Sequence, residues 1–276
     1  MKWLYNSIVA FLNVEPTDRN TPLSDLNQIA KTLRPGDIIL VEGRSRVSNV
    51  IRWITHSPWT HAALYIGTPN DILDPHLRLT VSHYFKGHDN EPLLVESRLG
   101  HGTVVQPLSF YQGAHLRIAR PMGLSGGDAH TIVAYSISRL GVPYDVRQIL
   151  DLFRFLLPWF VLPRRWRSSL FKFKSGQSTR TVCSTMVAEA FAQVNFPILP
   201  LVKEIEDGSI RFYRRNPKLC TPSDFDYSPY FRIIKYPLLG DTSKGKYRLL
   251  PWHNADELSQ KQRGIYIDSN LRTIKK

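Results

Sequence analysis

The stretch Gln177–Phe196, QSTRTVCSTMVAEAFAQVNF, decides the fold that we expect. Its apolar residues recur at the spacing of one helix face: Cys183, Met186, Val187, Ala190, Phe191 and Val194. A helix that begins near Thr181 has Cys183 in its first turn, where unpaired N–H groups and the helix dipole favour a thiolate. Taken alone, the stripe favours a simpler interpretation, a small buried cysteine, because free cysteines are among the most buried residues. Only catalytic partners found elsewhere in the sequence can overturn the interpretation of Cys183 as a structural residue.

The composition is that of a folded and basic protein. The chain has 276 residues, of which 42% are hydrophobic, enough to bury a core. Its net charge of +13 indicates anionic partners, which include phospholipid head groups, nucleic acid and acidic substrates. The two cysteines, Cys183 and Cys220, are too few for a disulfide framework or a four-cysteine zinc site, which favours a reducing compartment.

The sequence predicts three regions. Residues 1–22 form an amphipathic segment and a linker, residues 23–238 form the main domain, and residues 239–276 form a basic tail. The N-terminus differs from a signal peptide because polar residues interrupt its apolar run and no small-residue cleavage site follows, so we expect a cytoplasmic protein. Its amphipathic face fits packing on the domain or peripheral attachment to a membrane, and both remain open.

The segment THAALYIG, residues 60–67, is expected to form a strand that carries a histidine at its start. Alternation places His61, Ala63 and Tyr65 on one face of this strand. An imidazole in this position can act as the general base for a thiol, although a histidine merely hydrogen-bonded in the core fits equally well. His56 is the nearby competitor and ranks lower because it precedes a turn.

A carboxylate interrupts the otherwise apolar strand PLLVES, residues 92–97. Glu96 shares a face with Leu94 and, if buried, needs a partner such as an imidazole N–H. An exposed edge glutamate is the alternative. Two further strands, at 102–108 and 115–121, continue the pattern, so we expect a meander that brings Glu96 near His61.

Other segments give weaker signals. The expected helices cover residues 23–33, 47–54 and 127–140, the further expected strands cover 36–43 and 231–234, and a helix or turn begins at Pro222. Residues 69–90 are polar and are expected to form mostly a surface excursion.

An apolar run, Ile149–Leu162, is followed by basic and aromatic residues up to Lys174. It is too short to span a bilayer but fits an element that enters an anionic membrane interface. A buried hairpin with a basic end is the alternative, and a site for single-stranded nucleic acid is a third and weaker one.

Several fragments, in order along the chain, resemble one enzyme family: LRPGDIILVEG, THAALYIG, VES, GVPYD, TVCSTMVAEAF and TPSDF. They are similar to the circularly permuted papain-like cysteine hydrolases of the NlpC-type peptidase superfamily, whose relatives include the lecithin retinol acyltransferases. The resemblance covers Leu33 to Ile234. It implies an α+β fold in which an antiparallel sheet packs against a helix with the cysteine at its N-terminus. The apolar and basic segment at about residues 147–176 is an insertion in this pattern.

The resemblance also implies roles for individual residues. Cys183 corresponds to the nucleophile, His61 to the base, and Glu96 to the polar residue that orients the histidine. The residues expected to contact substrate are Tyr144, Ser184 and Tyr65. No metal site and no cofactor are expected.

The predicted function is therefore a thiol-dependent hydrolase or acyltransferase. Cys183 would attack an amide or ester to form an acyl-enzyme, and the basic and apolar insertion favours a lipid or lipid-linked substrate at an anionic membrane surface. The alternative is a catalytically idle relative that acts as a basic module for binding a membrane or a partner. Nucleic-acid binding is the least favoured function, since no base-reading helix is recognisable. The sequence does not indicate an oligomeric state.

Overall fold

A computed structural model describes residues 24–143, 183–205 and 208–237, together with positions 7, 10, 11, 13, 14, 266, 267, 273 and 274. The chain divides into two compact units, Met1–Leu238 and Leu239–Lys276. In the second unit, strand β9 (Tyr266–Ile267) pairs antiparallel with β10 (Thr273–Ile274). Tyr144 and the apolar and basic insertion lie outside the described residues, as does most of the N-terminal segment.

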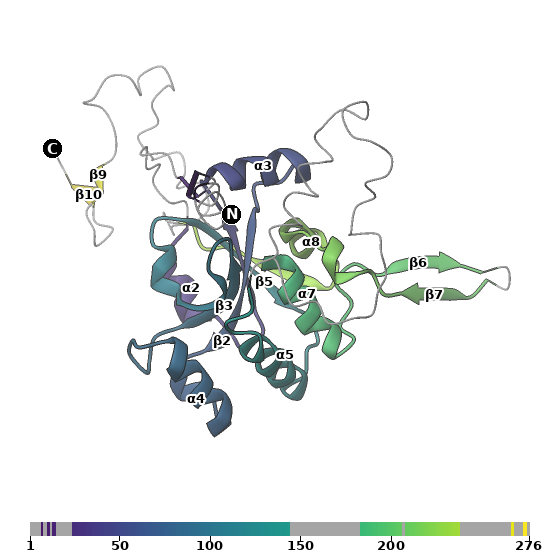
Figure 1. Cartoon of the computed structure of the whole chain (residues 1–276). Coiled ribbons are helices and arrows are strands. Elements are labelled where there is room, and N and C mark those ends of the chain that lie inside the picture. Colours follow the sequence, from purple (N-terminus) through teal and green to yellow (C-terminus); the bar gives the residue numbers. More distant parts are fainter. Residues whose placement is uncertain are drawn as a thin grey trace, which may run out of the picture. The chain divides into compact units, whose positions relative to one another are not determined.

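The first unit is built on a six-stranded antiparallel sheet with the order β4-β3-β2-β1-β5-β8 (Figure 1). The strands are β1 (Ile38–Glu42), β2 (His61–Gly67), β3 (Leu93–Arg98), β4 (Gly102–Pro107), β5 (His115–Pro121) and β8 (Phe231–Ile234). Strands β1 to β4 are neighbours in chain order, as predicted for a meander. The expectation that strand 115–121 continues the meander is wrong, because β5 pairs with β1 and not with β4. Helices accompany the sheet, and the expected mixed α+β class is confirmed as well.

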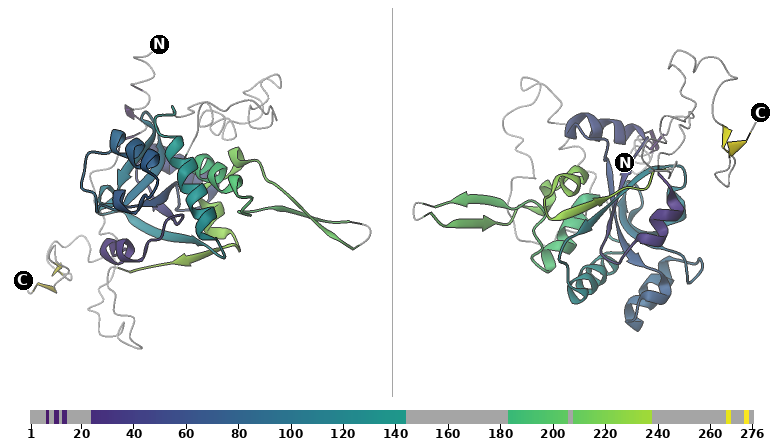
Figure 2. Two further views of the ribbon diagram at one scale, coloured as in Figure 1. Left: turned by 90° about the horizontal axis from the view of Figure 1, so that it is seen from below. Right: turned by 180° about the vertical axis from the view of Figure 1, so that it is seen from behind.

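Alternation along the strands produces two apolar clusters, one on each face of the sheet. Ala62 and Leu64 of β2 face the cluster formed with α5 (Gly126–Ser138) and α7 (Cys183–Gln193). Ala63 and Tyr65 face the other cluster, to which α2 (Leu26–Thr32) contributes Ile29. The helices α2 and α7 therefore cover opposite faces (Figure 2). Further elements are α3 (Arg46–Thr55), the 3-10 turn η2 (Leu108–Tyr111) and α8 (Pro222–Tyr227).

The expected surface excursion at 69–90 is partly wrong, because it contains helix α4 (Pro75–Tyr84). Asp74 caps this helix by accepting hydrogen bonds from the backbone N–H groups of His76 and Leu77, and Pro75 occupies the first helical position. Val81 is buried in the core with α5. Leu77 is partly buried against the same core, so this apolar contact and the cap together stabilise α4.

A hairpin that the sequence pattern did not reveal follows α7. Its strands, β6 (Leu201–Glu204) and β7 (Ile210–Tyr213), pair antiparallel, and every residue in them is exposed. The hairpin extends away from the sheet (Figure 1). Among the described residues, no helix is both long and apolar enough to cross a bilayer.

Candidate active site

His61 is the first residue of β2, where its backbone pairs with Val41 of β1. Its side chain is 20% exposed, so the ring lies at the edge of the packed interior. The ring Nε2 forms a hydrogen bond with Oε2 of Glu96 on the neighbouring strand β3. This bond fixes the orientation of the imidazole and leaves Nδ1 available on the other side of the ring.

Glu96 is fully buried, with 0% of the residue exposed, yet three polar side chains lie around its carboxylate. Its Oε2 also accepts a hydrogen bond from the Tyr111 hydroxyl, and Nε of Arg98 lies 3.8 Å from Oε1. Burial raises the pKa of the Glu96 carboxyl, but the His61 charge and the hydrogen bonds from His61 and Tyr111 outweigh burial and hold this pKa below its ordinary value. Glu96 is therefore a carboxylate at neutral pH.

Tyr111 is a member of this network that sequence reasoning missed. It ends the turn η2 and packs in the cluster on the His61 face of the sheet. Burial and the Glu96 charge raise the pKa of its hydroxyl well above the ordinary value, so the hydroxyl stays protonated and donates to the carboxylate. A short 3-10 turn has no strand or helix periodicity, so no pattern in the sequence indicates which way Tyr111 points.

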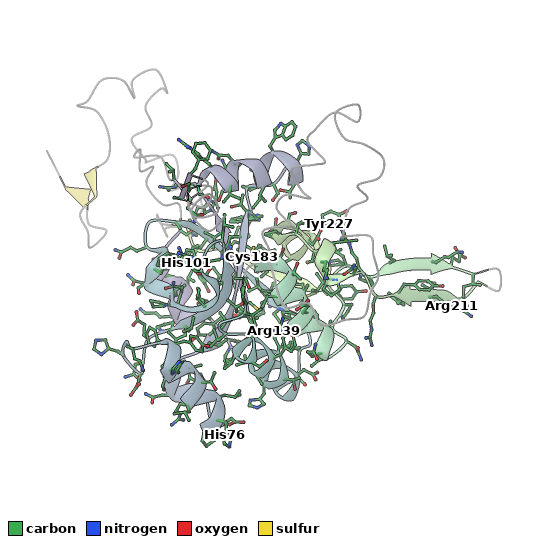
Figure 3. The ribbon with its side chains drawn as sticks, in the orientation of Figure 1. His76, His101, Arg139, Cys183, Arg211 and Tyr227 are labelled. Atoms are coloured by element: carbon green, nitrogen blue, oxygen red, sulfur yellow. The ribbon has the colours of Figure 1, made fainter. Side chains whose placement is uncertain are left out.

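Cys183 begins helix α7, which packs against β2 and β3 (Figure 3). The thiol forms a hydrogen bond with the His61 side chain, and the backbone N–H groups of Ala62 and Ser184 donate to the sulfur. The structure thus joins Cys183, His61 and Glu96, which lie on three different elements. Cys183 is only 7% exposed, whereas the side chain of its partner His61 is 20% exposed.

The electrostatics of the pair favour a thiolate beside an imidazolium. Burial raises the pKa of the Cys183 thiol, but the His61 charge and the donated hydrogen bonds outweigh it and lower this pKa. Burial lowers the pKa of His61, but the charges of Cys183 and Glu96 outweigh that effect and raise it to about 10. The proton therefore resides on the ring, and the sulfur is a thiolate.

The other predicted contact residues lie in different surroundings. The Ser184 backbone N–H donates to the sulfur, but the Ser184 hydroxyl donates to the Cys220 carbonyl at 2.6 Å and ties α7 to the segment before α8. Tyr65 is buried in the core four residues further along β2, about 13 Å from His61 at the usual rise per residue. Tyr144 lies outside the described residues.

The described residues also bear on the expected absence of a metal site. No group of three or more histidine, cysteine, aspartate or glutamate side chains in this part of the chain is placed to hold a metal ion.

One family model matches part of the chain. Residues 32–151 match the model of a family described as permuted papain-like amidase enzymes, YaeF/YiiX, C92 family. The match supports a permuted papain-like family. The matched range includes His61, Glu96 and Tyr111 and ends before Cys183. Because the family is described as amidases, the match also supports a hydrolytic enzyme. No curated protein matches the chain.

Among solved structures, the chain is similar to the crystal structure of metalloprotein yiiX from Escherichia coli O157:H7. The two are 16% identical, the similarity covers 74% of this chain and 97% of that chain, and the TM-score is 0.45. The narrower resemblance to NlpC-type peptidases and lecithin retinol acyltransferases stays a prediction.

Proposed function

We propose that the protein is a cysteine hydrolase that cleaves an amide or ester through an acyl-enzyme on Cys183. The observation that supports this most directly is the hydrogen-bonded series from the Cys183 thiol through His61 to the buried Glu96 carboxylate. A structural cysteine has no need of an imidazole held by a buried charge. Burying the Glu96 carboxylate costs free energy, and the cost is explained if this carboxylate stabilises the imidazolium that forms beside the thiolate.

In the proposed reaction the Cys183 thiolate attacks the carbonyl carbon and forms a carbon–sulfur bond. The His61 imidazolium then gives its proton to the leaving nitrogen or oxygen, and the bond to the leaving group breaks. In the second half, His61 removes a proton from water, the resulting hydroxide attacks the thioester, and the thiolate departs. The backbone N–H of Cys183 at the start of α7 is our candidate for stabilising the oxyanion. Another alcohol or amine in place of water would give acyl transfer.

The experiment uses p-nitrophenyl acyl esters of several chain lengths and follows the adduct on Cys183 by mass spectrometry. We expect a burst of p-nitrophenol and an acyl group on the peptide that contains Cys183. Cys183→Ala should lose both, while Cys220→Ala serves as the matched control because the Cys220 thiol is buried and burial raises its pKa well above the ordinary value. Equal turnover by Cys183→Ala and the unaltered protein would refute the mechanism.

We further propose that the substrate is a lipid or a lipid-linked molecule at an anionic membrane surface. The net charge of +13 supports this proposal, as do the large apolar side chains exposed on the β6–β7 hairpin. Sedimentation with vesicles tests it: binding to vesicles with anionic lipid and little binding to neutral vesicles is expected. Equal binding to both kinds, or none, would contradict the proposal.

The second candidate is a catalytically idle module that binds a membrane or a partner. The low exposure of Cys183, 7%, is the observation that favours it. Alkylation by iodoacetamide separates the two candidates, because an activated thiolate reacts quickly at neutral pH and a sealed structural thiol reacts slowly.

A further inference from the structure

A groove separate from the cysteine lies along the other end of helix α7. It has a volume of about 740 Å³ and is enclosed by α7, the segment that follows it, and the base of the β6–β7 hairpin. Cys183 and His61 do not line it. Its volume falls within the range of about 300–1,000 Å³ that is typical of small-molecule sites.

The walls of the groove are mostly apolar. Ala192 of α7 contributes a small side chain that leaves room, and Phe196 and Leu199 line the groove beside it. The hairpin adds Phe212 and Tyr213, which are 63% and 45% exposed. Large apolar side chains left open to water around a hollow indicate a ligand with an aliphatic portion.

The charged side chains that line the groove have a net positive charge. Its carboxylate, Asp224, lies 3.4 Å from a guanidinium nitrogen of Arg215, so these two charges offset each other. Arg214 also lines the groove, and among the residues that the structure describes it has neither an ion pair nor a hydrogen bond. A guanidinium beside apolar walls suits a carboxylate or phosphate.

From this arrangement we infer that the groove binds a single-chain anionic amphiphile, with its aliphatic chain along Ala192 and Phe196 and its head group on Arg214. The site is distinct from the proposed reaction at Cys183. Both lie on α7, and the Ser184 hydroxyl and the Cys220 carbonyl join the start of this helix to the wall of the groove.

The test uses the full-length chain and the fluorescent fatty acid 11-(dansylamino)undecanoic acid, kept below its micelle concentration. We expect saturable binding, competition by dodecanoate, and much weaker competition by the neutral dodecyl maltoside. Arg214→Gln should weaken dodecanoate binding about tenfold or more, the effect of one lost bond to a charged group. Lys203→Gln removes the same charge from the same hairpin outside the groove, so it should change nothing.

Ala192→Trp fills the groove and should abolish binding. Because this variant can fail to fold, a second measurement maps the site in the unaltered protein: a photoreactive diazirine fatty acid should label peptides from 188–200 and 212–230. Cys183→Ala should bind the probe unchanged, which separates this inference from the proposed hydrolysis. Any one of four results would overturn the inference. These are equal competition by dodecanoate and dodecyl maltoside, equal affinity of the Arg214 and Lys203 variants, labelling confined to other peptides, and binding only to intact vesicles.

Discussion

Replacing Glu96 by glutamine removes one negative charge from the interior while keeping the shape of the side chain. The carboxylate now stabilises a positive His61, and the positive ring in turn stabilises the Cys183 thiolate. Without the charge, the proton returns from the ring to the sulfur. We therefore expect the pH midpoint of thiolate formation on Cys183 to rise in Glu96→Gln.

The size of the effect follows from the geometry. Glu96 is fully buried, and one carboxylate oxygen accepts hydrogen bonds from both His61 and Tyr111, so solvent does not screen the interaction. A hydrogen bond to a charged group contributes about 1.5–3 kcal/mol, which corresponds to a rise of about 1–2 pH units in the midpoint of Cys183 alkylation.

The assay is the rate of carboxamidomethylation by iodoacetamide across pH, with the two cysteine-containing peptides quantified separately by mass spectrometry. Glu189→Gln is the matched control, because Glu189 lies on the same helix as Cys183 and, like Glu96, accepts a hydrogen bond from a tyrosine hydroxyl, that of Tyr135 at 3.0 Å. A folded Glu96→Gln variant whose Cys183 alkylation profile coincides with that of the control would refute the role given to this carboxylate.

Three further outcomes are expected. The pH profile of kcat/KM should rise on the acid side as Cys183 ionises below the ordinary thiol range, and fall near pH 10 as His61 loses its proton, which steady-state kinetics will measure. Tyr111→Phe removes one donor to the buried carboxylate and should lower stability by about 1–3 kcal/mol in urea unfolding, with a changed pH profile of alkylation. Asp37→Ala leaves the Arg120 guanidinium, now bound to Asp37 at 2.7 Å, without its partner, and should cost about 3–5 kcal/mol by the same assay. An unfolding midpoint unchanged in either variant, or a profile without the alkaline limb, would contradict the corresponding expectation.

Much of the sheet was predictable because its strands are buried on one or both faces. The expected bounds of β5 and β8 agree with the structure, and alternation correctly placed Leu94 and Glu96 on one face. Glu96 was recognisable because it interrupts an apolar strand, and His61 because it begins one. Such a polar side chain needs a partner when it is buried.

The elements that the sequence did not reveal lack a clear contrast between buried apolar positions and exposed polar positions. Helix α4 buries only Val81, so no continuous apolar stripe marks it. The β6–β7 hairpin is exposed on both faces, and its alternation therefore separates no core from solvent. The resemblance implied a substrate contact for Ser184, but the partner of its hydroxyl, the Cys220 carbonyl, depends on a fold contact that the sequence pattern does not encode.

The chain is anchored at both sides of the junction between α5 and α7. The Val142 carbonyl accepts a hydrogen bond from the backbone N–H of Thr103 at 2.8 Å, and the Ala62 N–H donates to the Cys183 sulfur. Both anchors are backbone N–H groups of the sheet, so they do not depend on which side chains stand at positions 103 and 62. Side-chain changes at these two positions can therefore leave the sulfur and the imidazole in register.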